Sequence, residues 1–457
     1  MSVLTVARRG TRAVSLEAVD AVAMPGCRRR LTAVQKRWLA SCGFSGQAGQ
    51  IAMVPDERGA LARVLVGVDR EDPLWALGEL AHGLPEGDYA LAPEGVLADR
   101  RLAALGFALG AYRCTHYRKG REGTARLVLS RALLDELDPI VQATTQVRDL
   151  VNRPSEDLGP AELAAQVKSV GKAHGARLRE WVGEELRRDN FPTIHAVGRA
   201  SQAAPRLVEL RWGKAKHPHV VLVGKGVCFD SGGLDLKTSD GMRWMKKDMG
   251  GAAHALALAD LVMQARLPIR LTLLVPAVEN AVGGNALRPG DVIRTRAGHA
   301  VEIDNTDAEG RLILCDALAY AGELQPDLII DFATLTGAAR VALGPDLPAL
   351  FGNRDDLREA VLAAGRDQHD PLWPMPLWRP YRRMLDSYVA DFANSGASRH
   401  AGAITAALYL ERFVPTDAAW LHVDVYAWND ADRPGRPKGG EAQGMRAFFA
   451  FLRARYS

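Results

Sequence analysis

The sequence predicts an α/β protein in which a smaller N-terminal α/β domain precedes a larger three-layer α/β/α domain. The length of 457 residues allows two to three domains with sizeable cores. A β-branched run at 219–224 ends in glycine, which is typical of a buried strand in an α/β sheet. Strand-like and helical segments then alternate towards the C-terminus, as they do when helices cover both faces of a sheet.

The N-terminal residues 1–142 are predicted to form the smaller domain. They contain a strand-like run at 62–68 and an alanine-rich helix at 103–112, and they carry no catalytic motif. Residues 143–160 are predicted to be a linker helix and boundary, because a helical stretch there runs into Pro154 and Pro160. Residues 161–457 then form the larger domain.

The larger domain is predicted to alternate strands and helices, with its polar motifs between them. After the strand at 219–224 we expect a helix at 252–264, strands at 270–275 and 300–303, a helix at 311–323 and a strand at 328–332. The segment 371–380, rich in proline and tryptophan, is predicted to be a rigid irregular loop near an interface or the rim of a cleft.

The segment Asn305–Leu312, Asn-Thr-Asp-Ala-Glu-Gly-Arg-Leu, is the most informative one in the chain. Asp307, Glu309 and Arg311 are spaced two residues apart, so an extended strand end would point all three to one face. Gly310 would let the chain turn into the following helix. Such a pair of acids is a weak signal alone, since most are solvated turns.

Further polar side chains follow the predicted strand at 219–224. Ligands of open α/β sheets gather beyond the carboxyl ends of the strands. The candidate site therefore combines residues from both segments: Lys225, Asp230, Lys237, Asp248, Asp307, Glu309 and Arg311.

Four carboxylates in one cleft repel one another and need cations. Two divalent ions would supply +4 against −4, provided that Lys225 binds as a neutral amine. Oxygen ligands with one nitrogen suit Mn²⁺, Mg²⁺, Zn²⁺ or Co²⁺ and differ from a thiolate zinc site. A paired-metal centre activates water and polarises a carbonyl, which indicates hydrolysis.

Each candidate residue also has a structural explanation when it is taken alone. Asp230 and Asp248 could be turn or capping residues, and Lys225, Lys237 and Arg311 could be solvated surface charges. His254, beside the site, is interpreted as a packed or surface residue. The chain has neither a phosphate-binding Gly-x-x-x-x-Gly-Lys-Ser/Thr loop nor a Gly-x-Ser-x-Gly elbow.

The composition restricts the remaining function classes. The net charge of +4 is close to neutral and does not indicate nucleic-acid binding. The five cysteines are scattered without metal spacing, so free thiols in a reducing compartment are expected. No run approaches membrane-spanning length, and a soluble cytoplasmic protein is predicted.

The motifs resemble those of the leucyl aminopeptidase family, the cytosolic two-metal aminopeptidases of peptidase family M17. The resemblance covers the chain from about residue 147 to its end. It rests on the segments 223–233 and 305–312, with supporting matches at 289–292, 331–338 and 401–407.

The resemblance implies a role for each site residue. Lys225, Asp230, Asp248 and Glu309 would surround one metal, and Asp230, Asp307 and Glu309 the other. Lys237 would hydrogen-bond the oxyanion formed when water attacks the peptide carbonyl. Arg311 would hold a bicarbonate ion that acts as general base. The substrate-binding positions implied are Met245, Asn305, Thr334, Leu335 and Gly337.

The chain departs from the family pattern near the specificity pocket. After Asp424 it reads Val-Tyr-Ala-Trp-Asn, where better-known members continue with small residues. Tyr426 could therefore narrow or reshape the pocket, and Asn429 lies in the same region. The glycine-rich segment 439–444 also differs. Leucine and other apolar residues are the preference expected from the resemblance alone.

The resulting hypothesis is a metal-dependent aminopeptidase that removes N-terminal residues from peptides. The resemblance implies a homohexamer, with the N-terminal domain serving assembly and limiting access. A DNA-binding regulatory protein on the same fold is the alternative, which near-neutral charge disfavours. A catalytically silent scaffold is a third reading, against which the complete set of site residues argues.

Overall fold

The computed structural model describes residues 3–7, 12–97, 99–117 and 124–457. The chain forms two compact units, Met1–Thr145 with Asn429–Lys438, and Gln146–Trp428 with Gly439–Ser457. All five cysteines lie in the described ranges and carry free thiols, as predicted. Within those ranges, no helix is long and apolar enough to cross a membrane.

In the described part of the first unit, six strands form one sheet in the order β1-β6-β5-β2-β4-β3. All neighbouring pairs are parallel except β3 with β4. The strands are β1 (Leu4–Val6), β2 (Val14–Val19), β3 (Ile51–Pro55), β4 (Leu61–Gly67), β5 (Gly87–Leu91) and β6 (Ala125–Leu129). The helices are α1 (Met24–Arg29), α2 (Ala33–Ser41), α3 (Leu80–Gly83) and α4 (Arg100–Gly110).

The predicted elements of this unit are confirmed with shifted ends. The strand expected at 62–68 is β4, and the helix expected at 103–112 is α4. Helix α4 begins earlier because Asp99 caps it, its side chain accepting a hydrogen bond from the Leu102 backbone N–H at 2.9 Å. The helical stretch expected before Pro154 is the last part of a longer helix, α5 (Arg131–Asn152).

The second unit is built around a nine-stranded sheet with the order β16-β15-β18-β14-β9-β11-β8-β7 in its described part, and β10 pairs with β11. The central strands β18, β14, β9 and β11 are parallel to their neighbours in this set. The strands are β7 (Arg177–Val182), β8 (Arg206–Trp212), β9 (His219–Gly224), β10 (Gly226–Asp230), β11 (Arg270–Asn280), β14 (Leu328–Ala333), β15 (Ala349–Gly352), β16 (Trp373–Pro374) and β18 (Trp420–Asp424).

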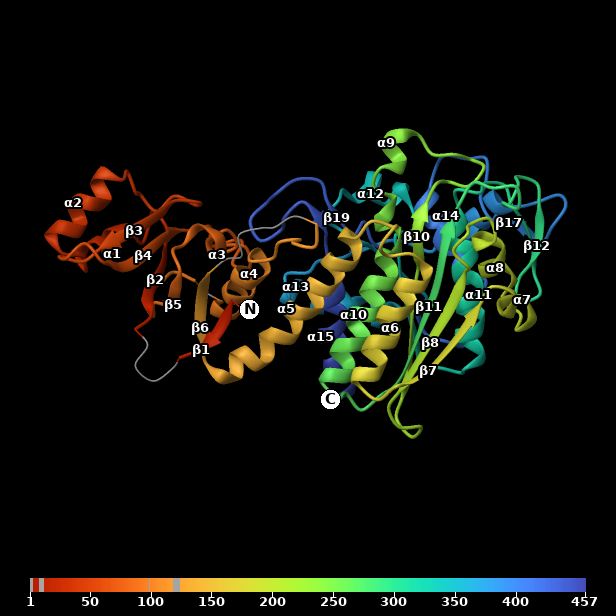
Figure 1. The fold of residues 1–457 in the computed structure, drawn as a ribbon, viewed down its shortest axis with the longest axis horizontal. Coiled ribbons are helices and arrows are strands. Elements are labelled where there is room, and N and C mark those ends of the chain that lie inside the picture. The colour runs from red at the N-terminus through yellow and green to blue at the C-terminus, as the bar shows by residue number, and fades with distance from the viewer. Residues whose placement is uncertain (1–2, 8–11, 98, 118–123) are drawn as a thin grey trace. The chain divides into compact units, whose positions relative to one another are not determined.

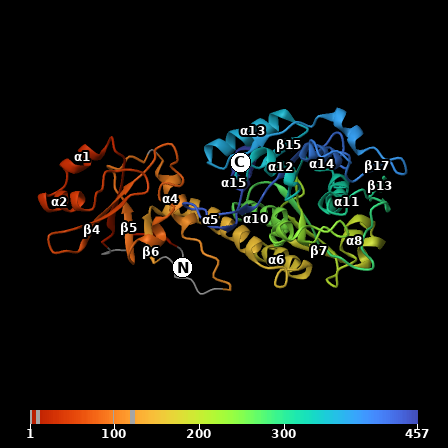
Figure 2. The same cartoon turned by 90° about the horizontal axis from the view of Figure 1, so that it is seen from above.

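Helices cover both faces of this sheet, which confirms the predicted three-layer α/β/α arrangement. Figure 1 shows α6 and α10 on one face and α8 and α11 on the other, and α10 and α11 both contact β9. Helices α13 and α15 pack together in the same unit (Figure 2). The helices are α6 (Pro160–Ala173), α7 (Glu184–Arg188), α8 (Pro192–Gly198), α9 (Ser239–Met242), η1 (Met245–Met249), α10 (Gly250–Gln264), α11 (Glu309–Glu323), α12 (Gly337–Leu343), α13 (Asp355–Asp367), η2 (Arg379–Leu385), α14 (Gly402–Glu411) and α15 (Met445–Tyr456).

The central strand β9 and the helix α10 consist mostly of apolar residues, as their burial requires. Every residue of β9 is buried, as is almost all of α10, because both lie in the interior of the unit. The strands and helices predicted at 219–224, 252–264, 270–275, 311–323 and 328–332 are all confirmed. Strand β11 extends to Asn280, beyond the prediction, because it pairs with β8, β9 and β10.

Short strands outside the large sheet complete the unit. The strand expected at 300–303 is β13 (Ala300–Glu302), which pairs with β12 (Val292–Arg294) and β17 (Phe392–Ala393) in a separate small sheet. Strands β19 (Trp428–Asn429) and β20 (Gly439–Gly440) are two residues each.

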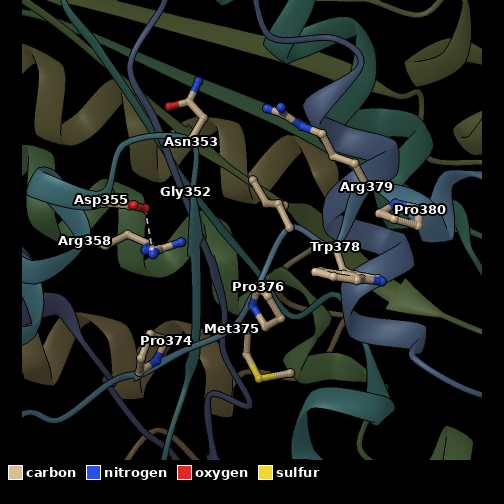
Figure 3. Close-up of a pocket in the computed structure, with 11 residues that line it drawn as sticks. Gly352, Asn353, Asp355, Arg358, Pro374, Met375, Pro376, Trp378, Arg379 and Pro380 are labelled. Atoms are coloured by element: carbon tan, nitrogen blue, oxygen red, sulfur yellow. Dashed lines mark ion pairs between the residues drawn. The ribbon is translucent and has the colours of Figure 1, made fainter.

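The proline-rich loop at 371–380 lines a pocket. Its residues Pro374, Met375, Pro376 and Trp378 face β15 and the start of α13 across a cavity of about 610 Å³ (Figure 3). The prediction that this segment lies at the rim of a cleft is therefore confirmed. The segment is not irregular throughout, however, because Trp373–Pro374 form β16 on the edge of β15 and Arg379 begins η2.

Candidate functional site

The candidate site is built where strands of the large sheet end. Lys225 directly follows β9, and Asp230 is the last residue of β10. The Lys225 backbone N–H donates to the Phe332 carbonyl at 3.0 Å, and its own carbonyl accepts from Ala252 N–H at 2.8 Å. These bonds fix the chain between β14 and α10. The prediction that polar residues gather beyond the strand ends is confirmed for Lys225 and Asp230.

The predicted local structure of the second motif is wrong. Asp307, Glu309 and Arg311 do not lie along an extended strand end. Strand β13 stops at Glu302, a turn contains Asp307, and α11 begins at Glu309. Gly310 is helical and is not a turn residue. The side chains of Asp307 and Glu309 still meet, because the turn lies directly before the first turn of the helix.

Lys225 lies between two buried carboxylates. Its Nζ is 2.7 Å from Asp248 Oδ2 and 3.0 Å from Glu309 Oε1. It also donates a hydrogen bond to the Thr334 carbonyl at 2.9 Å. Burial lowers the pKa of Lys225, but the surrounding carboxylates outweigh that effect and hold its pKa above the ordinary value. Lys225 is thus an ammonium in this arrangement.

Lys237 makes the corresponding contacts with the other acids. Its Nζ is 2.8 Å from Asp230 Oδ2 and also forms an ion pair with Asp307 Oδ1. Its side chain remains 16% exposed, whereas that of Asp230 is 3% exposed. Lys237 is therefore the cation at the accessible side of the cluster.

The carboxylates fit a bound cation. One ligand oxygen from each of Asp230, Asp307 and Glu309 lies within 4.8 Å of the others. Among the described residues, no backbone N–H, hydroxyl or amide group donates to the buried oxygens Asp248 Oδ2, Asp307 Oδ1 and Glu309 Oε1. Buried oxygens are normally satisfied. These oxygens are met at ion-pair distance by lysine ammonium groups, which divalent ions could replace.

The acids carry more negative charge than the lysines balance. Burial, and then repulsion from Asp230, raises the pKa of Glu309 to about 8. The same two causes raise the pKa of Asp307 to about 6. Part of the cluster would therefore take up protons near neutral pH unless additional positive charge entered the site. This is the electrostatic behaviour expected of a metal-binding carboxylate group.

A close approach between α11 and Lys225 makes Gly310 necessary. A Cβ atom at Gly310 would lie 2.4 Å from Lys225 Cε and 2.7 Å from its Nζ. Any larger residue would push the lysine away from Asp248 and Glu309. Gly310 is thus needed because it lets Lys225 pack against the helix, and not because it forms the turn that was predicted from the sequence.

Arg311 is buried and is positioned by a residue that sequence reasoning missed. Its Nη1 donates to the Asn394 carbonyl at 2.6 Å, and burial lowers its pKa. Asn394 also accepts from Asn305 N–H at 3.2 Å and donates to the Asn305 carbonyl at 2.7 Å. No feature of the sequence around Asn394 indicates this role.

Asn280 is a second missed residue. Its side-chain amide donates to Asp230 Oδ1 at 2.8 Å and to the Thr306 carbonyl at 3.1 Å. The Gly232 backbone N–H donates to the same carboxylate oxygen at 2.9 Å. Asn280 therefore orients Asp230 and joins the two motifs, which are distant in sequence. The sequence signal that could have identified Asn280 is its position at the end of the strand β11.

The predicted substrate-binding residues lie around the acids. Met245 begins η1, which contains Asp248, and Gly337 begins α12. Thr334 Oγ1 donates to Asp248 Oδ1 at 2.8 Å. The Leu335 N–H donates to Asp424 Oδ1 at 3.0 Å, which holds the loop between β14 and α12. Asn305 Oδ1 accepts from Asp307 N–H at 2.8 Å and so shapes the turn.

His254 is a packed structural residue, as the sequence indicated. It is buried in α10, where its Nδ1 donates to the Gly250 carbonyl at 2.6 Å and its Nε2 accepts from Gln443 N–H at 2.9 Å. Both ring nitrogens are thus used.

Family models match most of the chain. The model described as the cytosol aminopeptidase family, catalytic domain, matches residues 145–449. The model described as the M17 aminopeptidase, N-terminal domain, matches residues 16–130.

Individual proteins match as well. A probable cytosol aminopeptidase of Syntrophotalea carbinolica is 43% identical over 309 residues, which are 67% of this chain and 62% of that protein. The crystal structure of the cytosol aminopeptidase from Coxiella burnetii superposes with a TM-score of 0.97 at 47% identity, covering 100% of both chains. The bottromycin maturation enzyme BotP in complex with Mn superposes with a TM-score of 0.87 at 33% identity, covering 97% of this chain and 99% of BotP.

Proposed function

Because this chain belongs to the cytosol aminopeptidase family, we propose that it is a metal-dependent aminopeptidase that hydrolyses the N-terminal residue from peptides. The matches confirm the predicted family, the enzyme class of leucyl aminopeptidase-type metallo-exopeptidases, and the two-domain architecture. The observation that carries the proposal is the cluster of acids in which the buried oxygens Asp248 Oδ2, Asp307 Oδ1 and Glu309 Oε1 are met only by lysine ammonium groups in the described part of the chain.

The acids would hold two divalent ions. Lys225, Asp230, Asp248 and Glu309 would surround one ion, and Asp230, Asp307 and Glu309 the other. When bound, the ions would supply an activated water and a polarised carbonyl. The manganese in BotP supports Mn²⁺, and Zn²⁺, Co²⁺ or Mg²⁺ also suit the oxygen ligands. Lys225 would have to lose its proton to act as a ligand.

Lys237 would stabilise the charge that develops on the substrate. As the partly exposed cation of the cluster, it can point an N–H donor at the peptide carbonyl oxygen. A donor held in place before the reaction costs no reorganisation, and such donors are commonly the largest catalytic contribution. Its present partners, Asp230 and Asp307, would then face the metals instead.

Arg311 would hold a bicarbonate ion that serves as general base. Its guanidinium is buried, and within the described residues its Nε makes no hydrogen bond. Asn394 fixes the side chain through Nη1. A planar anion could accept donors from the remaining edge of the guanidinium.

We also propose the wider setting of the enzyme. Residues 1–142 would form the domain that serves assembly and limits access, residues 143–160 the linker, and residues 161–457 the catalytic domain. A homohexamer is expected from the resemblance. A cytoplasmic location is supported by the names of the relatives. Peptides would be the substrates.

The test is metal-dependent hydrolysis. Protein stripped of metal would be assayed on leucine p-nitroanilide and on peptides with other N-terminal residues, with Mn²⁺, Zn²⁺, Co²⁺ or Mg²⁺ added back. Asp307→Ala should abolish the restored activity, since it removes a predicted ligand. Asp304→Ala is the matched control, because Asp304 is an exposed acid three residues away. Absence of hydrolysis of every substrate in metal-bound protein would contradict the proposal.

A further inference from the structure

Two cations converge on one tyrosine beside the candidate metal cluster. Lys247 Nζ lies 4.8 Å from the centroid of the Tyr426 ring, and Arg340 Cζ lies 5.0 Å from it. Arg340 Nη1 also donates a hydrogen bond to the Tyr426 hydroxyl at 3.1 Å. These contacts hold the tyrosine ring in a positively charged setting.

Neither cation has a carboxylate partner among the described residues, although Lys247 is only 7% exposed. The nearby acids are engaged elsewhere. Asp248 pairs with Lys225, and Asp424 accepts from the Leu335 and Thr336 backbone N–H groups. Burying an ammonium group without a counter-ion is costly, so Lys247 requires a functional explanation. Arg340 is exposed and can reach the same space from the solvent side.

The two cations and the tyrosine come from the segments that carry the proposed substrate-binding residues. Lys247 lies in η1, two residues after Met245 and next to Asp248. Arg340 lies in α12, which starts at Gly337. Tyr426 lies two residues after the end of β18.

The segment after β18 packs close to the start of α10. An ideal Cβ at Gly250 would meet Ala427 Cβ at 2.6 Å and Thr334 Cγ2 at 3.0 Å. Thr334 in turn bonds the carboxylate of Asp248. The chain on either side of this contact therefore places Lys247, and the Tyr426 ring that it contacts, beside Asp248 of the metal cluster.

On the basis of the proposed aminopeptidase activity, we propose that Arg340, Lys247 and Tyr426 form the subsite for the N-terminal side chain and select an acidic residue, glutamate or aspartate. A side-chain carboxylate would accept charge-assisted hydrogen bonds from the two cations. A leucine side chain would exclude water from the subsite and leave both cations without a partner. A site that is built to pair with a polar group strongly rejects a substrate that lacks that group. The tyrosine fills space where the family pattern has a small residue, which disfavours branched apolar side chains.

The test compares substrates that differ only in charge. Manganese-loaded enzyme would be assayed on Glu-Ala-Ala-amide, Gln-Ala-Ala-amide and Leu-Ala-Ala-amide. The C-terminal amide ensures that only the N-terminal side chain carries a carboxylate. We expect kcat/KM for the glutamate peptide to exceed that for the glutamine peptide about tenfold or more. Added salt should reduce that ratio by screening.

Variants assign the effect to the cation pair. Arg340→Gln should lower the Glu/Gln ratio several-fold, mainly through a higher KM, and Arg340→Lys should restore part of it. Arg366→Gln is the matched control, since Arg366 is an exposed arginine near the end of α13, and it should keep the wild-type ratio. An unchanged ratio in Arg340→Gln, or a wild-type ratio near one, would overturn the subsite assignment.

A binding measurement separates this inference from the proposed function. Calorimetry would compare free L-glutamate with L-glutamine on manganese-loaded wild type and Arg340→Gln. Preference for glutamate that depends on Arg340 supports the subsite even if no peptide is cleaved, in which case the aminopeptidase proposal alone fails. Rapid cleavage of the leucine peptide together with equal binding of both amino acids would keep the aminopeptidase and overturn the acidic subsite.

Discussion

Replacing Gly310 with alanine should destabilise the protein, although helix propensity alone favours the change. Alanine is about 1 kcal/mol better than glycine in a helix interior. The new Cβ would lie 2.4 Å from Lys225 Cε and 2.7 Å from Nζ, whereas carbon atoms prefer about 3.5–4.0 Å. Lys225 would therefore have to move by about 1 Å.

That movement would break contacts that the lysine makes with buried groups. Its Nζ is 2.7 Å from Asp248 Oδ2, 3.0 Å from Glu309 Oε1 and 2.9 Å from the Thr334 carbonyl. Breaking a buried ion pair costs about 3–5 kcal/mol. After the gain in helix propensity, the free energy of unfolding should fall by about 2–4 kcal/mol.

The assay is thermal unfolding of metal-free protein followed by circular dichroism, with Gly26→Ala as the control. Gly26 is also helical, in α1, but a Cβ there would meet nothing within 4 Å. We expect Gly26→Ala to leave the protein as stable or slightly more stable, and Gly310→Ala to lower the midpoint. Calorimetry should also show weaker Mn²⁺ binding for Gly310→Ala. Equal midpoints for both variants, with unchanged Mn²⁺ affinity, would refute the reasoning.

Of three further predictions, two concern the acids of the site and one concerns the buried pair of Asp331 and His422. Asn280→Ala removes the 2.8 Å hydrogen bond to Asp230 Oδ1, so calorimetric Mn²⁺ affinity should fall about 10–100-fold; unchanged affinity would exclude an orienting role. Burial lowers the pKa of His422, but Asp331 outweighs this and keeps it above the ordinary value. The stabilisation of the folded protein by the Asp331–His422 ion pair is thus complete below about pH 6.5, and it is lost as pH rises through the pKa of His422 in the folded state. Asp331→Asn should therefore lower the free energy of unfolding more at pH 6 than at pH 9 in urea titrations, and an equal loss at both would contradict the assignment. Mn²⁺ at about 100 times its Kd should stabilise wild type by about 2.7 kcal/mol, and Asp307→Ala should show a smaller shift in thermal midpoint than wild type; an identical shift would remove that acid from the ligand set.

Much of the fold could be read from the sequence because local patterns and burial agree. The run 219–224 is uniformly apolar, and the structure places it as β9 with helices on both sides. The alanine- and leucine-rich segment after Gly250 is α10, with nearly every residue buried. Where pattern and environment pointed to different answers, the prediction failed: Asp307 to Arg311 alternates like a strand end but contains a turn followed by the start of α11.

The amino-acid sequence by itself determined the fold class, the family and the residue types that could hold metals, because these depend on patterns within short segments. Only the tertiary structure decided which groups meet. It brought Asn280 to the site from the end of β11 and Asn394 from the residue after β17, and it set Gly310 against Lys225. It also placed the Arg340 and Lys247 side chains against the ring of Tyr426, where neither pairs with a carboxylate of the described residues. Such contacts join residues that are far apart in sequence, from 50 positions for Asn280 and Asp230 to 179 for Lys247 and Tyr426 (426 − 247), and no local pattern encodes a distance across such separations.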